Sequence, residues 1–164
     1  MKNIREMVTA ALMATIMVVS KVVLDALPNI ELISLLVIVF TLELPRLTLP
    51  AVYTYVVLYG LFNGFGIWWF PQLYLWLILY FIIRMLRRSG SVLLYAVVSA
   101  FFGLSYGALY AVSYAAMNGI AAGFAWWITG IPFDLLHCAG NFVCALLLIK
   151  PLRFALQKCK GALC

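Results

Sequence analysis

The sequence predicts an all-α polytopic membrane protein with six transmembrane helices and with both the N- and C-termini in the cytoplasm. Two observations carry this prediction. Of the 164 residues, 67% are hydrophobic and only 10% are charged, a balance that a water-soluble core of this size does not need. Apolar stretches of about 20 residues, the length a helix needs to cross about 30 Å of hydrocarbon, follow one another along the chain. We therefore treat residues 1–164 as a single integral-membrane domain.

Charged residues, prolines and glycines mark the boundaries of the predicted helices. The first helix is expected to be retained, because no convincing small-residue cleavage site of a signal peptide follows it. The second is the weakest span, since only eleven uncharged residues separate Glu31 from Glu43, and a re-entrant segment is an alternative there. The six predicted helices lie near residues 5–26, 29–44, 48–66, 71–86, 92–114 and 124–151.

Residues 115–131 are apolar enough to suggest a seventh span, but the positive charges argue against one. With six helices, ten of the eleven Lys and Arg residues fall on the cytoplasmic side and only Lys21 falls outside, as the positive-inside rule expects. A seventh helix would move the basic tail outside. We therefore predict that 115–131 form an outer loop or short helix. The last helix proper is expected to start at Pro132, because proline fits a first helical turn.

A polar stripe lies in the last predicted helix. Asp134, His137 and Asn141 occupy positions i, i+3 and i+7, which places them on one helix face in the outer half of the membrane. Ionisable groups within a bilayer are costly and normally face a cavity or a partner, so substrate binding is the prediction. In one alternative, Asp134 caps the helix start while the other two bond to neighbouring helices. A proton relay is a further alternative.

Aromatic and amide side chains gather on the same outer side of the predicted bundle. They form a candidate surface for stacking a flat ligand, although an aromatic belt at the membrane interface explains part of the clustering. These candidates are Asn63, Trp68, Trp69 and Gln72 between the third and fourth helices, Tyr106 and Tyr110 in the fifth, and Trp126 and Trp127 in the predicted loop.

Small residues recur at spacings of four in two of the predicted helices. In the first helix, Ala10 and Ala14 form an AxxxA pattern close to the cytoplasmic end. Such a face permits tight packing against another helix, either within this chain or in a separate protein. The fifth helix carries a longer face of the same kind, made of Ser99, Gly103, Gly107 and Ala111.

Motifs for catalysis are missing from the sequence. It contains no nucleotide-binding glycine loop, metal-ligand cluster or Ser/His/Asp arrangement, so we expect neither an enzyme nor a resident metal or cofactor. Binding of nucleic acid is not expected either. The four cysteines show no CxxC spacing, so no disulfide is expected. Any uphill transport would need work supplied by a partner.

Three stretches of the chain resemble the S component of energy-coupling factor (ECF) transporters: LPNIELISLLVIVFTLEL (27–44), LYGLFNGFGIWW (58–69) and GIPFDLLHCAGNFV (130–143). The resemblance implies a multi-pass receptor in the bacterial cytoplasmic (inner) membrane that captures a vitamin or related micronutrient at its outer face. It also implies partners, namely a transmembrane T protein and two ATPase subunits that hydrolyse ATP.

The resemblance also assigns roles to the residues introduced above. It implies that Ala10 and Ala14 pack against the T protein and that the stripe of Asp134, His137 and Asn141 contacts the ligand. Signatures typical of riboflavin, thiamine or biotin binding are missing, so the substrate is not assigned. Two other functions stay open: a non-transport membrane scaffold of the rod-shape-determining type, and a stand-alone small-molecule carrier.

Overall fold

The computed structural model describes residues 2–24 and 32–163. Within these residues the secondary structure is helical and contains no strand, which confirms the all-α prediction. The elements are α1 (Lys2–Val23), α2 (Ile33–Glu43), α3 (Pro45–Asn63), the 3₁₀ helix η1 (Ile67–Trp69), α4 (Gln72–Leu86), the 3₁₀ helix η2 (Arg87–Ser89), α5 (Val92–Leu104), α6 (Tyr106–Asn118) and α7 (Ile120–Leu163).

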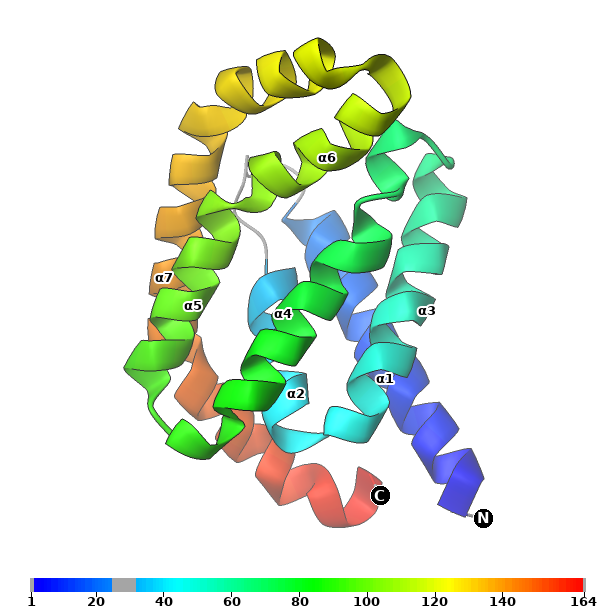
Figure 1. Cartoon of the computed structure of the whole chain (residues 1–164). Helices are drawn as coiled ribbons and strands as arrows, with labels where there is room; N and C mark the ends of the chain where they lie inside the picture. The colour runs from blue at the N-terminus through cyan, green and yellow to red at the C-terminus, as the bar shows by residue number, and fades with distance from the viewer. Residues whose placement is uncertain (1, 25–31, 164) are drawn as a thin grey trace.

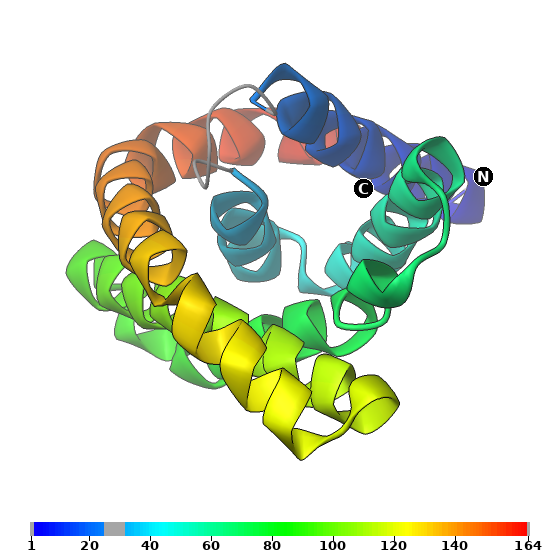
Figure 2. The same ribbon diagram turned by 90° about the horizontal axis from the view of Figure 1, so that it is seen from above.

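The helices form a ring around α2. Seen from above, α1, α3, α4, α5 and α7 surround α2 (Figure 2). The helix α6 packs beside the first part of α7 at one end of the bundle (Figure 1). The start of α1 and the end of α7 lie together at the opposite end (Figure 1). The described chain therefore has one end that carries both termini and one end that carries α6.

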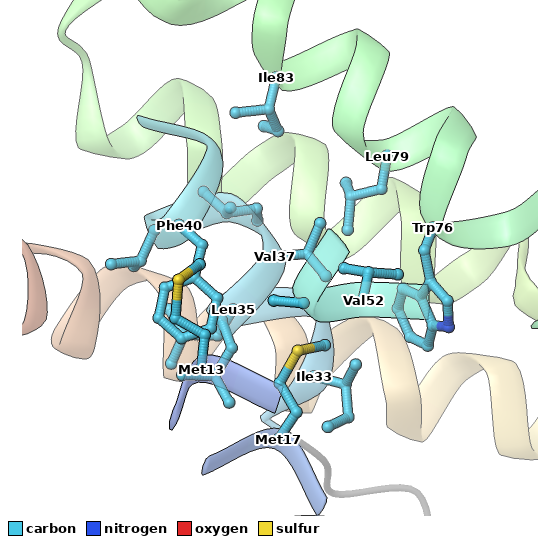
Figure 3. Packing of buried hydrophobic residues seen from close by; sticks show 14 of the residues in the cluster. Met13, Met17, Ile33, Leu35, Val37, Phe40, Val52, Trp76, Leu79 and Ile83 are labelled. Atoms are coloured by element: carbon cyan, nitrogen blue, oxygen red, sulfur yellow. The ribbon is translucent and has the colours of Figure 1, made fainter. Parts of the chain in front are cut away.

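The central helix α2 is enclosed on every side. All 11 of its residues are buried, because it packs against α4, α7, α3, α1 and α5. Figure 3 shows Val37 and Phe40 of α2 among Met13 of α1, Val52 of α3 and Leu79 of α4. Eleven residues rise only about 16 Å along a helix, so α2 by itself is too short to cross about 30 Å of hydrocarbon. The first residues of the predicted helix 29–44 lie outside the described residues.

Polar contacts fix the C-terminal end of α2 between two neighbouring elements. Glu43 is 6% exposed, and its Oε1 accepts hydrogen bonds from Arg153 Nε at 2.7 Å and Gln157 Nε2 at 2.9 Å, both on α7. Arg87 of η2 donates from Nε to the carbonyl oxygen of Leu42 at 3.0 Å. Positive groups near a helix C-terminus are favoured by the helix dipole, so these contacts stabilise the position of α2.

The region predicted as one helix over 92–114 is divided into α5 and α6 at Ser105. Beyond it, the structure corrects the prediction of an outer loop or short helix at 115–131. Helix α6 continues to Asn118, the chain turns at Gly119, where φ is +91°, and α7 begins at Ile120. Glycine suits this turn because it adopts positive φ without steric cost.

Pro132 lies within α7 instead of starting the last helix. The helix has 44 residues with Pro132 and Pro151 inside it, and its path bends after its first part and again toward its end (Figure 1). A proline cannot donate to the carbonyl oxygen four residues earlier and kinks a helix. Such kinks are tolerated in membrane helices because neighbouring groups satisfy the freed carbonyls. Proline therefore bends α7 where the sequence suggested a boundary.

Length and composition of the described helices fit an all-α membrane protein. Four segments are long and apolar enough to cross a membrane: Ile4–Val23, Ile67–Ser89, Val92–Asn118 and Ile120–Cys159. Large apolar side chains are exposed around the bundle, among them Met7, Phe62, Met85 and Leu147. An apolar surface of this extent is typical of contact with lipid.

Candidate functional site

A polar group with aromatic neighbours lies between α4, α6 and α7 near the end of the bundle that carries α6. We call it the amide–tyrosine cluster; its members are Gln72, Trp76, Tyr106, Tyr110 and His137. Gln72, the first residue of α4, is 6% exposed. Its Nε2 donates to Tyr106 Oη at 3.3 Å and to Tyr110 Oη, while its Oε1 accepts from Trp76 Nε1 at 2.7 Å. Both ends of the amide are therefore held in one orientation.

The rings of the cluster pack on one another. Tyr106 and Tyr110 are one helical turn apart on α6, and their rings stack with centroids 4.9 Å apart. The imidazole of His137 also contacts Tyr106, edge-on, at 4.7 Å between ring centroids. His137 is 4% exposed. The cluster thus combines flat ring faces with an amide, two hydroxyls and an imidazole.

Asp134 caps the start of α6 from across the interface with α7. Its side chain is 6% exposed, and Oδ1 accepts the backbone N–H of Gly107 at 2.9 Å. Gly107 is the second residue of α6, where the first N–H groups lack partners inside the helix. The sequence alternative in which Asp134 caps a helix start matches this contact, except that the helix is α6 and not its own. Its Oδ2 is buried and has no hydrogen-bond partner within the described residues.

Asn141 joins three helices. It is 3% exposed, and its Nδ2 donates to Ser34 Oγ of α2 at 3.3 Å and to the carbonyl oxygen of Ser99 of α5 at 3.1 Å. These contacts match the interhelical role that the sequence left as an alternative for this residue. Ser34 was missed by the sequence reasoning. Its only signal was a hydroxyl in an otherwise apolar stretch.

The small-residue face, which is divided between α5 and α6, receives α7; the sequence predicted the close approach of another helix but not which one. A Cβ added at Gly103 would lie 2.9 Å from the carbonyl oxygen of His137, and one added at Gly107 would lie 2.4 Å from Asp134 Oδ2. Side chains larger than hydrogen do not fit at such distances without movement. The close approach brings the polar stripe of α7 against α5 and α6.

Three other predicted residues form a separate group at the turn between α3 and α4. Trp69 donates from Nε1 to the carbonyl oxygen of Val56 at 3.0 Å, and Trp68 makes an edge contact with Tyr59 at 5.4 Å between ring centroids. The exposed Asn63 bonds to the carbonyl oxygen of Tyr59, in its own helix, at 3.0 Å. These contacts stabilise the turn itself.

Trp126 and Trp127, which the sequence analysis placed in a loop, lie on the first part of α7. Trp126 is 45% exposed, and its ring stacks on Tyr114 of α6 with centroids 4.5 Å apart. Trp127 is 38% exposed and makes an edge contact with Phe124. The first contact joins α6 to α7, and the exposure of both rings fits an interfacial aromatic position.

Ala10 and Ala14 are directed into the chain's own core. They are 9% and 0% exposed, and their helix packs mainly on α3. The AxxxA spacing therefore serves internal packing in this structure, which is the alternative that the sequence left open beside docking on a partner.

The arrangement offers hydrogen bonds beside flat apolar faces, a combination found in small-molecule binding sites. Among the described residues, no group of three His, Cys, Asp or Glu side chains lies together as a metal site. No family model, curated protein or solved structure matches the chain.

Proposed function

We propose that the chain is the substrate-binding membrane subunit of an ATP-driven ECF transporter. It captures a vitamin or related micronutrient at the outer face of the bacterial cytoplasmic membrane for uptake. The observation that carries this proposal is the amide–tyrosine cluster, in which hydrogen-bonding groups and flat rings are gathered at the end of the bundle opposite the termini. Small-molecule sites commonly combine apolar and aromatic walls with a few convergent polar groups.

In this proposal a flat heteroaromatic ligand exchanges hydrogen bonds with the cluster. Gln72 already bonds to Tyr106 and Tyr110, so a ligand that replaces one of these bonds leaves no buried polar group unpaired. The ligand stacks on the tyrosine rings, while Asp134 and Asn141 position α6 and α7. ATP is hydrolysed by two ATPase subunits that act through a T protein, since the sequence shows no nucleotide-binding loop.

One observation favours a second candidate, a membrane scaffold of the rod-shape-determining type. Asp134 and Asn141 bond within the chain, to Gly107 on one side and to Ser34 and Ser99 on the other. Polar groups used as bonds between helices need no ligand. A scaffold would copurify with cell-wall enzymes, whereas the proposed subunit copurifies with a T protein and ATPases.

The decisive experiment is mass spectrometry of small molecules retained by the gently purified chain. The double variant Tyr106→Phe/Tyr110→Phe removes two hydroxyls and keeps both rings, so we expect affinity for the retained molecule to fall about tenfold or more. Tyr53→Phe is the matched control, because its hydroxyl donates to the carbonyl oxygen of Leu73 at 2.9 Å, between α3 and α4. Equal retention by all three proteins would disprove the binding role of the cluster.

A further inference from the structure

A groove of about 600 Å³ runs along the surface between α1 and α3. Its volume lies within the range of sites that hold small ligands. It is lined by Glu6, Met7, Ala10, Ala11, Arg46, Leu47, Pro50 and Thr54. Met7 is 71% exposed, and the adjacent Val8 and Leu12 are exposed as well. The groove therefore opens on an apolar surface that faces lipid.

Two opposite charges stand at one end of this groove. Glu6 lies near the start of α1 and Arg46 near the start of α3, at the end of the bundle that carries the termini (Figure 1). Within the described residues, neither side chain forms an ion pair or hydrogen bond, with the other or with a third group. The remaining lining is mostly apolar, so the charged end belongs at the membrane–water interface and the apolar part within the bilayer.

Pro50 also lines the groove. It lies inside α3 and has no N–H, so the α-helical bond to the carbonyl oxygen of Arg46, four residues earlier, is not made. The groove end is lined by a guanidinium and a carboxylate, from Arg46 and Glu6. From there to Thr54 the groove extends about 12 Å along α3.

We propose that this groove binds one zwitterionic phospholipid with a primary-amine headgroup, such as phosphatidylethanolamine. Its phosphate pairs with the guanidinium of Arg46, and its ammonium group donates to the carboxylate of Glu6. One acyl chain lies along Met7, Ala11 and Pro50. This proposal does not depend on the transport function.

Headgroup chemistry separates this lipid from others. An anionic lipid without an amine would satisfy Arg46 but leave the carboxylate of Glu6 close to a negative phosphate. A choline headgroup has the positive charge but no N–H to donate. A headgroup with a phosphate and a primary ammonium group complements both charges and can donate hydrogen bonds to Glu6.

The test is native mass spectrometry of the delipidated full chain, titrated separately with phosphatidylethanolamine, phosphatidylcholine and phosphatidylglycerol of identical acyl chains. We expect one phosphatidylethanolamine to bind about tenfold more tightly than either of the others. Glu6→Gln should abolish this preference, and Arg46→Gln should weaken binding of all three lipids. Arg84→Gln, an exposed cation at the same end of the bundle on α4, is the control and should change nothing.

Filling the groove tests its location. Ala11→Phe should remove the bound lipid, whereas Val19→Phe, at a position of α1 that is 53% exposed and outside the groove lining, should not. If Ala11→Phe does not elute as a single folded species, the smaller Ala11→Leu takes its place.

Three results would overturn the proposal. The first is binding of phosphatidylglycerol or phosphatidylcholine that is as tight as that of phosphatidylethanolamine, or tighter. The second is unchanged binding of phosphatidylethanolamine in the groove-filling variant. The third is that a photo-crosslinker at position 11 captures a protein instead of a lipid in native membranes.

Discussion

At the scale of single residues, Asp134 has a role that depends on a break in a neighbouring helix. Because α5 ends at Leu104 and α6 begins at Tyr106, the first N–H groups of α6 lose their partners in the preceding turn. The carboxylate of Asp134 accepts one of them, from Gly107 at 2.9 Å. A buried polar group without a partner destabilises the fold, more so within a membrane.

Replacing Asp134 should therefore destabilise the isolated chain. We expect Asp134→Ala to lower the free energy of unfolding by about 1–2 kcal/mol, the range for loss of a helix cap. Asp134→Asn keeps one acceptor oxygen and should lose less. Thermal unfolding in detergent measures both. An alanine variant as stable as the parent would show that the cost of burying the carboxylate outweighs the cap.

Gly107 should tolerate no side chain. An added Cβ would clash with the carboxylate of Asp134, so Gly107→Ala must displace the side chain that caps α6 and should cost about 1–3 kcal/mol. Gly130→Ala is the matched control on α7, where a Cβ would meet nothing within 4 Å. Because glycine weakens a helix interior relative to alanine, this control should be neutral or stabilising by up to about 1 kcal/mol. Similar losses in both variants would contradict the close approach.

At the scale of elements, a substitution at Ala14 tests whether this face of α1 packs within the chain or docks on a partner. Its side chain is 0% exposed, so Ala14→Leu should lower the stability of the isolated chain by about 1–3 kcal/mol. Ala155→Leu, at an exposed position of α7, should change it by less than about 0.5 kcal/mol. Unchanged unfolding of Ala14→Leu, together with lost assembly on a T protein, would instead favour docking.

Helix type and most helix positions could be predicted because apolar length and charge placement determine them. The ends of α4 and the start of α5 at Val92 follow the prediction closely. The break at Ser105 could not be predicted, since a serine in an apolar run carries no signal for it. The prediction that the last helix starts at Pro132 was wrong for a physical reason. Proline fits both the first turn of a helix and a kink within one, and packing against neighbouring helices decides between the two.

The same limit applies to the candidate site. The spacing of Asp134, His137 and Asn141 correctly places them on the buried side of α7. Their partners depend on contacts between distant parts of the chain: Asn141 meets Ser34, which is 107 positions away. Trp76 was not singled out, although its indole fixes Gln72. No local pattern specifies such pairs.

At the scale of the whole molecule, the basic end carries both chain ends, and we predict that it faces the cytoplasm. The elements that reach this end hold most of the described cations: Arg5 near the start of α1, Arg46 near the start of α3, Arg84 near the end of α4, Arg87 and Arg88 in η2, and Lys150, Arg153 and Lys158 in the last part of α7. In a chain with Cys159 as its only cysteine, the exposed thiol should react with a membrane-impermeant reagent only after the cells are permeabilised.

The opposite end supplies the control for this orientation. A cysteine-free chain carrying Asn118→Cys, at the exposed end of α6, should be labelled in intact cells. Labelling of Cys159 in intact cells would show that the orientation is the reverse of the predicted one. Labelling of both thiols from the same side would show a different number of spans.

The enclosure of α2 has a consequence for biogenesis. The helix α2 precedes α7 in the chain, but the ring around α2 is completed only by α7, whose side chains hold both Glu43 and Ser34. Until α7 has been synthesised, the hydroxyl of Ser34 and the carboxylate of Glu43 lack the partners that α7 supplies. We therefore expect α2 to reach its enclosed position only after α7 has been synthesised.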